Sequence, residues 1–228
     1  MRIMVVLFCA MVFSSSAWAQ NPIVKIVSTD IPGFVSEEGG SFIDLFRQAG
    51  ENTGFDVELT LMPWQRAVRR VEKSEDQMII PFSRTPERED RFTWVVMFNE
   101  VHNGFVTVGE AVDSMEAAKA LDTVIVWKGS SQQAYLEQAG FENLYPVSSA
   151  DTILSLLKTG RAAAWYGVLA EARSTIAQSS EYDDLTMGAV VDSEQVWLAG
   201  PASLDPAPYG AFAEEVERLR DAAAAAAQ

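Results

Sequence analysis

The protein has 228 residues, of which 48% are apolar and 21% are charged, a balance typical of folded proteins. Its 17 basic and 32 acidic residues give a formal net charge of −15, which argues against nucleic acids and anionic lipid surfaces as partners. A single cysteine excludes a disulfide-stapled scaffold.

Residues 1–19 have the order of a secretory signal peptide. Arg2 precedes an apolar run from Ile3 to Phe13, and Ala17-Trp18-Ala19 supplies the small residues of a cleavage site. Cleavage is therefore expected after Ala19, and the remaining chain has no apolar stretch long enough for a membrane anchor. Without these residues the chain contains no cysteine, so we expect an exported, periplasmic protein stabilised by its core alone.

The first half of the chain alternates strands and helices. A helix with Ser41 as its N-cap follows a glycine-rich loop and carries Ile43 and Phe46 on one face. Pro63 at a first helical position opens a second amphipathic helix over 64–73. Strands are expected over 23–28, 55–61 and 77–82. This order predicts a mostly parallel α/β layer.

The second half repeats the pattern. Ser114 and Ser149 each cap a helix, and Gly129-Ser130-Ser131 opens another that ends at Gly140. A further helix runs to about Ile176 and the last begins at about Tyr209. Strands are expected over 123–127 and 162–166.

Two similar βα stretches in succession predict two lobes. We place lobe 1 at residues 20–104 and 195–228 and lobe 2 at residues 105–194. The chain crosses between them at about 103–108 and 190–200, so that the last helix packs on lobe 1.

Basic residues are concentrated in one segment of this acidic chain. Seven lie there: Arg66, Arg69, Arg70, Lys73, Arg84, Arg88 and Arg91. Most of them are expected to pair with neighbouring acids on a solvated face. Arg88 differs, because it follows a strand and a Ser/Thr/Pro loop, at the sheet edge where open α/β sheets bind ligands.

Four segments together resemble the family 3 extracellular solute-binding proteins of bacterial transport systems. They are "PWQRAV", "FSRTPEREDRF", "VWKGSSQQAYLEQAGF" and "ADTILSLLKTGRAAAWYG", in that order. The resemblance implies a two-lobed type II periplasmic-binding-protein fold with two crossover hinge strands. It also implies capture of a small, carboxylate-bearing, amino-acid-like solute, which is delivered to an ABC permease of the inner membrane.

The resemblance also implies site residues. The arginine of the S-x-T-x-x-R pattern, which grips the ligand carboxylate in the family, corresponds to Arg88, with Ser83 beside it. The Gly-Ser-Ser helix start corresponds to Ser130 and Ser131, which either contact the ligand or serve only as N-caps. A guanidinium suits this role physically because it can hold a carboxylate bidentately.

Aromatic side chains are the remaining candidates. Phe34, in the glycine-rich loop, matches a position where the family places a stacking aromatic ring. Trp64 either forms a wall of the cleft or packs in the core, as its place on the apolar helix face favours. Tyr166 is expected to line the pocket, with Trp165 in the buried strand.

One segment departs from the family pattern. The acid that pairs with the ligand ammonium in amino-acid binders falls near Val168 here, and the next acid is Glu171. An α-amino acid would then leave a buried positive charge without its usual counterion, which is costly. Glu171 or a first-lobe acid substitutes, or the solute lacks the amine.

Enzymatic functions are less well supported. His102 is the only histidine, which excludes a His-rich metal site, and no phosphate-binding glycine loop or zinc motif is present. We expect no metal and no cofactor, and a monomeric protein. Two alternatives stay open: an enzyme that resembles cyclohexadienyl dehydratase on the same fold, and a soluble sensor that meets a membrane receptor.

Overall fold

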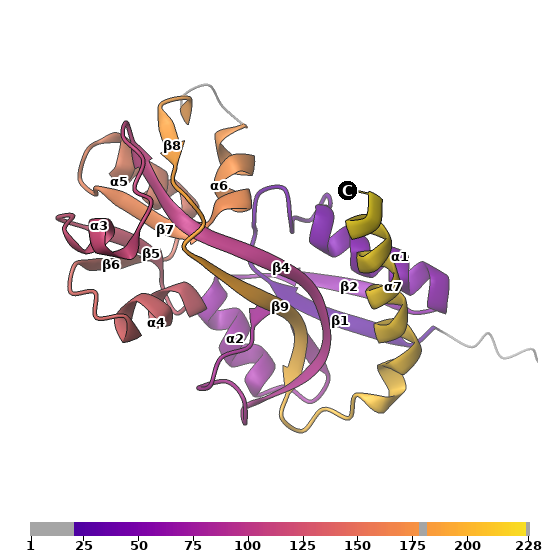
Figure 1. Ribbon diagram of the computed structural model, residues 1–228. Coiled ribbons are helices and arrows are strands. Elements are labelled where there is room, and N and C mark those ends of the chain that lie inside the picture. Colours follow the sequence, from indigo (N-terminus) through magenta and orange to yellow (C-terminus); the bar gives the residue numbers. More distant parts are fainter. Residues whose placement is uncertain (1–20, 178–181, 227–228) are drawn as a thin grey trace, which may run out of the picture.

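The computed structural model describes residues 21–177 and 182–226, and Figure 1 shows two lobes joined by two long strands. The predicted signal peptide lies outside the described residues. Lobe 1 contains β1 (Ile23–Ser28), α1 (Ser41–Thr53), β2 (Asp56–Leu61), α2 (Trp64–Glu72) and β3 (Gln77–Ser83). The long strands are β4 (Phe92–Val108) and β9 (Asp192–Pro201).

Lobe 2 lies between these two strands. It contains α3 (Met115–Lys119), β5 (Val124–Trp127), α4 (Ser131–Gln138), β6 (Leu144–Val147), α5 (Ala150–Lys158), β7 (Ala164–Val168), α6 (Leu169–Ile176) and β8 (Leu185–Met187). The chain ends with the short 3-10 helix η2 (Ala207–Tyr209) and α7 (Gly210–Ala226). None of the helices in the described residues is long and apolar enough to cross a membrane.

The strands form one sheet in the order β2-β1-β3-β9-β4-β7-β5-β6, with β8 paired to β4. Within each lobe the pairs are parallel, as predicted: β1 pairs with β2 and β3, and β5 pairs with β6 and β7. The crossover pair β4 and β9 is antiparallel, and β9 also joins β3 antiparallel. The parallel prediction therefore holds for the lobes but not for the strands that connect them.

The period-two alternation of strand side chains builds a helix layer on each side of the sheet. In lobe 1, Ile26 faces the cluster formed with α1 and α7, whereas Val27 faces α2. In lobe 2, Trp165 faces α5 and α6, whereas Tyr166 faces α3 and α4. Helix α7 packs beside α1, so the end of the chain returns to lobe 1 as expected (Figure 1).

Three of the predicted helix caps are present and one is wrong. The hydroxyls of Ser114, Ser130 and Ser149 each accept the backbone N–H of the third residue of the helix that follows. Ser41, however, is the first helical residue, and the cap is Gly40. A Cβ at Gly40 would lie 2.5 Å from the Phe34 carbonyl group, so the loop admits only glycine there.

Two further boundaries differ from the predictions. Pro63 is the N-cap of α2 rather than its first residue, and its carbonyl accepts the N–H groups of Arg66 and Ala67. The first crossover strand begins at Phe92, well before the predicted 103, because β4 pairs with β9 from Phe92 to Asn103. The lobe boundaries at 104/105 and 194/195 stay a prediction.

Candidate functional site

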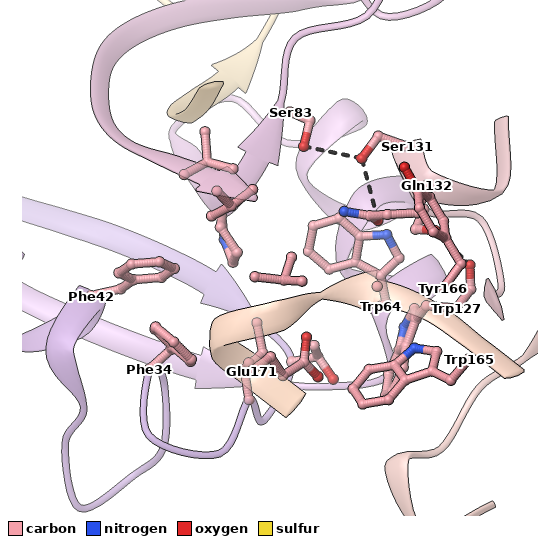
Figure 2. Close-up of a pocket in the computed structure, with 18 residues that line it drawn as sticks. Phe34, Phe42, Trp64, Ser83, Trp127, Ser131, Gln132, Trp165, Tyr166 and Glu171 are labelled. Atoms are coloured by element: carbon pink, nitrogen blue, oxygen red, sulfur yellow. Dashed lines mark hydrogen bonds between the residues drawn. The ribbon is translucent and has the colours of Figure 1, made fainter. Parts of the chain in front are cut away.

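A cavity of about 100 Å³ lies where the two lobes meet, and Figure 2 shows the side chains that line it. Lobe 1 supplies residues that follow the carboxyl ends of β1 and β3, together with Trp64 of α2. Lobe 2 supplies the start of α4, the end of β7 and the first turn of α6. The cavity therefore lies at the sheet edge where α/β proteins bind ligands, and each lobe forms part of its wall.

Six of the seven predicted site residues line this cavity: Phe34, Trp64, Ser83, Ser130, Ser131 and Tyr166. Arg88 does not; it lines a neighbouring pocket, which shares Ser130 and Ser131 with the first. Because no ligand is present, the binding role of all seven stays a prediction.

Six of the described residues that line the cavity are aromatic. Phe34, Phe42, Trp64, Trp127 and Trp165 contribute rings, together with Tyr166. Trp64 combines the two roles that the sequence left open: its ring packs 6.0 Å from that of Phe82 in the lobe 1 core and also faces the cavity. Its indole N–H donates to the Gly129 carbonyl at 3.3 Å, so it also joins the two lobes.

The start of α4 forms the polar end of the cavity. Ser130 is a structural cap, since its hydroxyl accepts from Gln133 N at 3.1 Å and donates to Trp127 O at 2.7 Å. Ser131 instead donates its hydroxyl to Ser83 Oγ at 3.0 Å, a bond between the lobes that Figure 2 marks. The N–H groups of Ser131 and Gln132 lie in the first turn, where the helix offers no acceptor, so they are available to a ligand.

Arg88 is buried between the lobes. It lies in the turn between β3 and β4, and its guanidinium donates to Ser83 O at 3.0 Å and to Gly129 O at 3.3 Å. The same group lies 4.2 Å from the centroid of the Phe82 ring. Burial lowers the pKa of Arg88 to about 10, although the carboxylate of Glu194 acts in the opposite direction. Arg88 is therefore still a cation at neutral pH, and two backbone carbonyls share its charge.

Glu171 lines the cavity from the first turn of α6. Among the described residues, no donor lies within hydrogen-bond distance of its carboxylate, and no cation pairs with it. Burial raises the pKa of Glu171 from an ordinary 4.5 to about 7. Val168, where the family pattern expects an acid, also lines the cavity and offers only an apolar surface.

A polar network at the crossover strands holds α4 in place. The side-chain amide of Asn103 donates to Asp192 Oδ2 at 3.3 Å and to Glu194 Oε1 at 3.1 Å. Gln132, next to the serine pair, donates to the same Glu194 carboxylate and to Asn103 Oδ1 at 3.4 Å. The start of α4 is thus tied to both strands about which the lobes could move.

Tyr166 lies close to this network. Its ring lies 5.0 Å from that of Phe105 and stacks on that of Tyr135 at 6.2 Å. Within the described residues its buried hydroxyl has no hydrogen-bond partner, and burial raises its pKa.

Sequence analysis did not select Trp127 or Gln132. Both flank the Gly-Ser-Ser helix start that it did select: Trp127 lies two residues before Gly129, and Gln132 directly follows Ser131. Their position next to this helix start was the feature of the sequence that could have identified them as cavity residues.

No protein-family model and no curated protein matches the sequence. Many solved structures do match. The arginine-binding protein of T. maritima in its holo form is 20% identical, with 87% of this chain and 90% of that chain covered and a TM-score of 0.74. An amino acid ABC transporter substrate-binding protein from Streptococcus pneumoniae bound to L-arginine is 17% identical, with 88% and 90% covered and a TM-score of 0.74.

A histidine kinase sensor domain with similarity to periplasmic binding proteins also matches, at 16% identity, 91% and 94% coverage and a TM-score of 0.79. At these identities the similarity establishes the fold. The predicted type II periplasmic-binding-protein fold is confirmed, and so is the resemblance to the fold of amino-acid substrate-binding proteins.

Proposed function

We propose that the protein is a periplasmic receptor that captures a small, amino-acid-like solute between its lobes and delivers it to an ABC permease. The observation that supports this function best is the cavity walled by both lobes. A solute in such a cavity contacts both lobes only when they are closed. It therefore stabilises the closed form by its difference in affinity for the two forms.

The solute carboxylate would bind at the polar end of the cavity. Ser83 and the free N–H groups at the start of α4 lie there, and Arg88, which lines the neighbouring pocket, donates to the carbonyl of Ser83. A guanidinium binds a carboxylate more strongly than it binds neutral carbonyls. The carboxylate would therefore replace the Gly129 carbonyl as one partner of Arg88.

The crossover strands would act as the hinge. The strands β4 and β9 connect the lobes, and the amides of Asn103 and Gln132 link these strands to the ligand-facing end of α4. Rotation about these strands would separate Ser83 from Ser131, which now join the lobes.

A thermal-shift screen of amino acids, other carboxylates and polyamines tests the receptor function. At least one compound is expected to raise the melting temperature, because binding to the native state alone stabilises it by mass action. Small-angle scattering with that compound should show a smaller radius of gyration, or no larger one if the free lobes are already closed.

Replacement of Arg88 by alanine should weaken binding by roughly 2 to 5 kcal/mol, measured by calorimetry. Unchanged affinity would remove Arg88 from the site.

A sensor is the second candidate, and the matched histidine kinase sensor domain is the observation that favours it. Both candidates require the same capture step and differ only in the membrane partner. Capture of detergent-solubilised membrane proteins by the liganded receptor would separate them: a permease supports transport, and a receptor kinase supports sensing. Turnover of prephenate or arogenate by catalytic amounts of protein would instead support the dehydratase alternative.

A further inference from the structure

The charge of the cavity wall is the starting point. Among the described residues that line the cavity, Glu171 is the only carboxylate, and none is a lysine, arginine or histidine. Arg88, the nearest candidate for a balancing charge, faces the neighbouring pocket and donates to two carbonyls. With Glu171 ionised, the cavity has a net negative charge.

Glu171 also has no partner of its own. Glu194, a half-buried carboxylate near the hinge, accepts hydrogen bonds from the amides of Asn103 and Gln132. No described donor does this for Glu171, which is also half-buried, and withdrawing a carboxylate from water without a partner is costly. A structural role would call for such a partner, whereas a ligand-binding role leaves the position open for the ligand.

The surroundings of Glu171 suit a cation. Figure 2 shows its carboxylate directed into the cavity, on the side of Phe34 and Trp165, with Ser83 and Ser131 on the opposite side. The face of an aromatic ring carries partial negative charge and attracts cations, most strongly when water is excluded. Aromatic side chains and one carboxylate in the same wall together form a site for an organic ammonium group.

We propose that the solute is a small organic cation, whose positively charged nitrogen is bound by Glu171 and the aromatic wall formed by Phe34 and Trp165. This inference rests on the proposed receptor function. It adds that the cavity selects solutes by the positive charge of a nitrogen atom. The positive charge is required, whereas a carboxylate on the same solute adds affinity through the serine end. Glu171 thus replaces, one helical turn later, the acid that the family pattern expects near Val168.

Matched pairs of compounds isolate the charge from the shape. Choline and 3,3-dimethylbutan-1-ol differ in a quaternary nitrogen against a carbon, and so do N-trimethylglycine and 3,3-dimethylbutanoate. L-Alanine and 2-methylpropanoate form a pair in which a primary ammonium group is replaced by a methyl group. Calorimetry is expected to show that, in every pair that binds, the ammonium compound binds at least about tenfold more tightly than its partner.

Two variants locate the effect. Glu171→Gln keeps the size of the side chain and removes its charge. It is expected to reduce the ratio of affinities within each compound pair to less than about threefold. Glu142→Gln makes the same change at an exposed position of lobe 2 and should keep the full preference. Far-UV circular dichroism and thermal melting confirm that both variants fold.

The outcomes separate the inference from the function on which it rests. Equal binding within the pairs by the unmodified protein would overturn the inference, and so would a preference that survives Glu171→Gln. In both cases binding itself would leave the receptor function standing. If no pair, amino acid, amine or carboxylate binds, the receptor function fails and the inference fails with it.

Discussion

Arg88 and Glu171 are both charged side chains placed where the lobes meet, but their surroundings differ. The guanidinium of Arg88 donates to carbonyls of both lobes and rests on the Phe82 ring. The carboxylate of Glu171 has no partner among the described residues and faces a cavity. The first arrangement stabilises the structure as it stands, whereas the second lowers its stability until a ligand arrives. The partners of a charged side chain between the lobes thus indicate what it contributes to the stability of the ligand-free protein.

Replacement of Arg88 by alanine should have the largest effect on stability. Loss of two hydrogen bonds to a charged group and of the Phe82 contact should lower the free energy of unfolding by about 3 kcal/mol. Urea denaturation measures this change. Arg84→Ala is the matched control, because Arg84 is more exposed and pairs with Glu89 at the surface; it should cost less than about 1 kcal/mol. Equal losses for the two variants would contradict a structural role for Arg88.

Glu171→Gln should raise the free energy of unfolding, whereas Arg88→Ala lowers it. A folded-state pKa near 7, above the ordinary 4.5, means that the native protein binds this proton more tightly than the unfolded chain does. Native stability therefore falls as the pH rises through this range. The variant should be more stable than the unmodified ligand-free protein by roughly 2 kcal/mol at pH 8 and equally stable at pH 4.

Urea denaturation at these two pH values measures the difference. A variant that is less stable at pH 8 would show that Glu171 has a favourable partner in the native protein.

Glu194→Gln is the comparison variant, because the carboxylate of Glu194 has hydrogen-bond partners. It removes the charge that accepts from Asn103 and Gln132 and that lies near Arg88. The free energy of unfolding at pH 8 should fall by about 1 kcal/mol, a typical net value for a hydrogen bond. A gain in stability, as expected for Glu171→Gln, would show that the two carboxylates do not differ in the way their partners suggest.

Ser130→Ala should have the smallest effect. Ser130 only caps α4, so its loss should cost about 1 kcal/mol or less in thermal unfolding and leave the affinity for a recognised solute within about threefold. A larger loss of affinity than of stability would place its hydroxyl in the binding site and not only at the helix end.

Local sequence patterns predicted most of the elements. Apolar spacing located α1, α2 and α5, and serines marked three helix starts correctly. The elements not predicted differ in their local signals. The strand β6 has only four residues and contains Pro146, and the middle of β4 carries the polar residues Asn99, Glu100 and His102, whereas residues 92–98 at its start form a strand-favouring run that was not selected. These strands form because a partner strand is present, and that partner is distant in sequence.

The candidate site was predicted less completely. Residue type and order selected six residues that do line the cavity, because they lie at strand ends and helix starts, which converge at one sheet edge. Residue type and order did not predict that Arg88 donates to backbone carbonyls, or that Trp127 and Gln132 line the cavity. Those contacts depend on how closely the lobes approach each other.

The sequence by itself determined the α/β layers, the succession of two similar halves and the residue types near the sheet edge, since these follow from periodicity and helix capping over a few neighbouring residues. Only the tertiary structure decided which charge is paired and which is left facing a cavity. Pairing depends on distances between Ser83, Gly129 and Glu171, which lie in different lobes or elements, and local patterns carry no information on such distances.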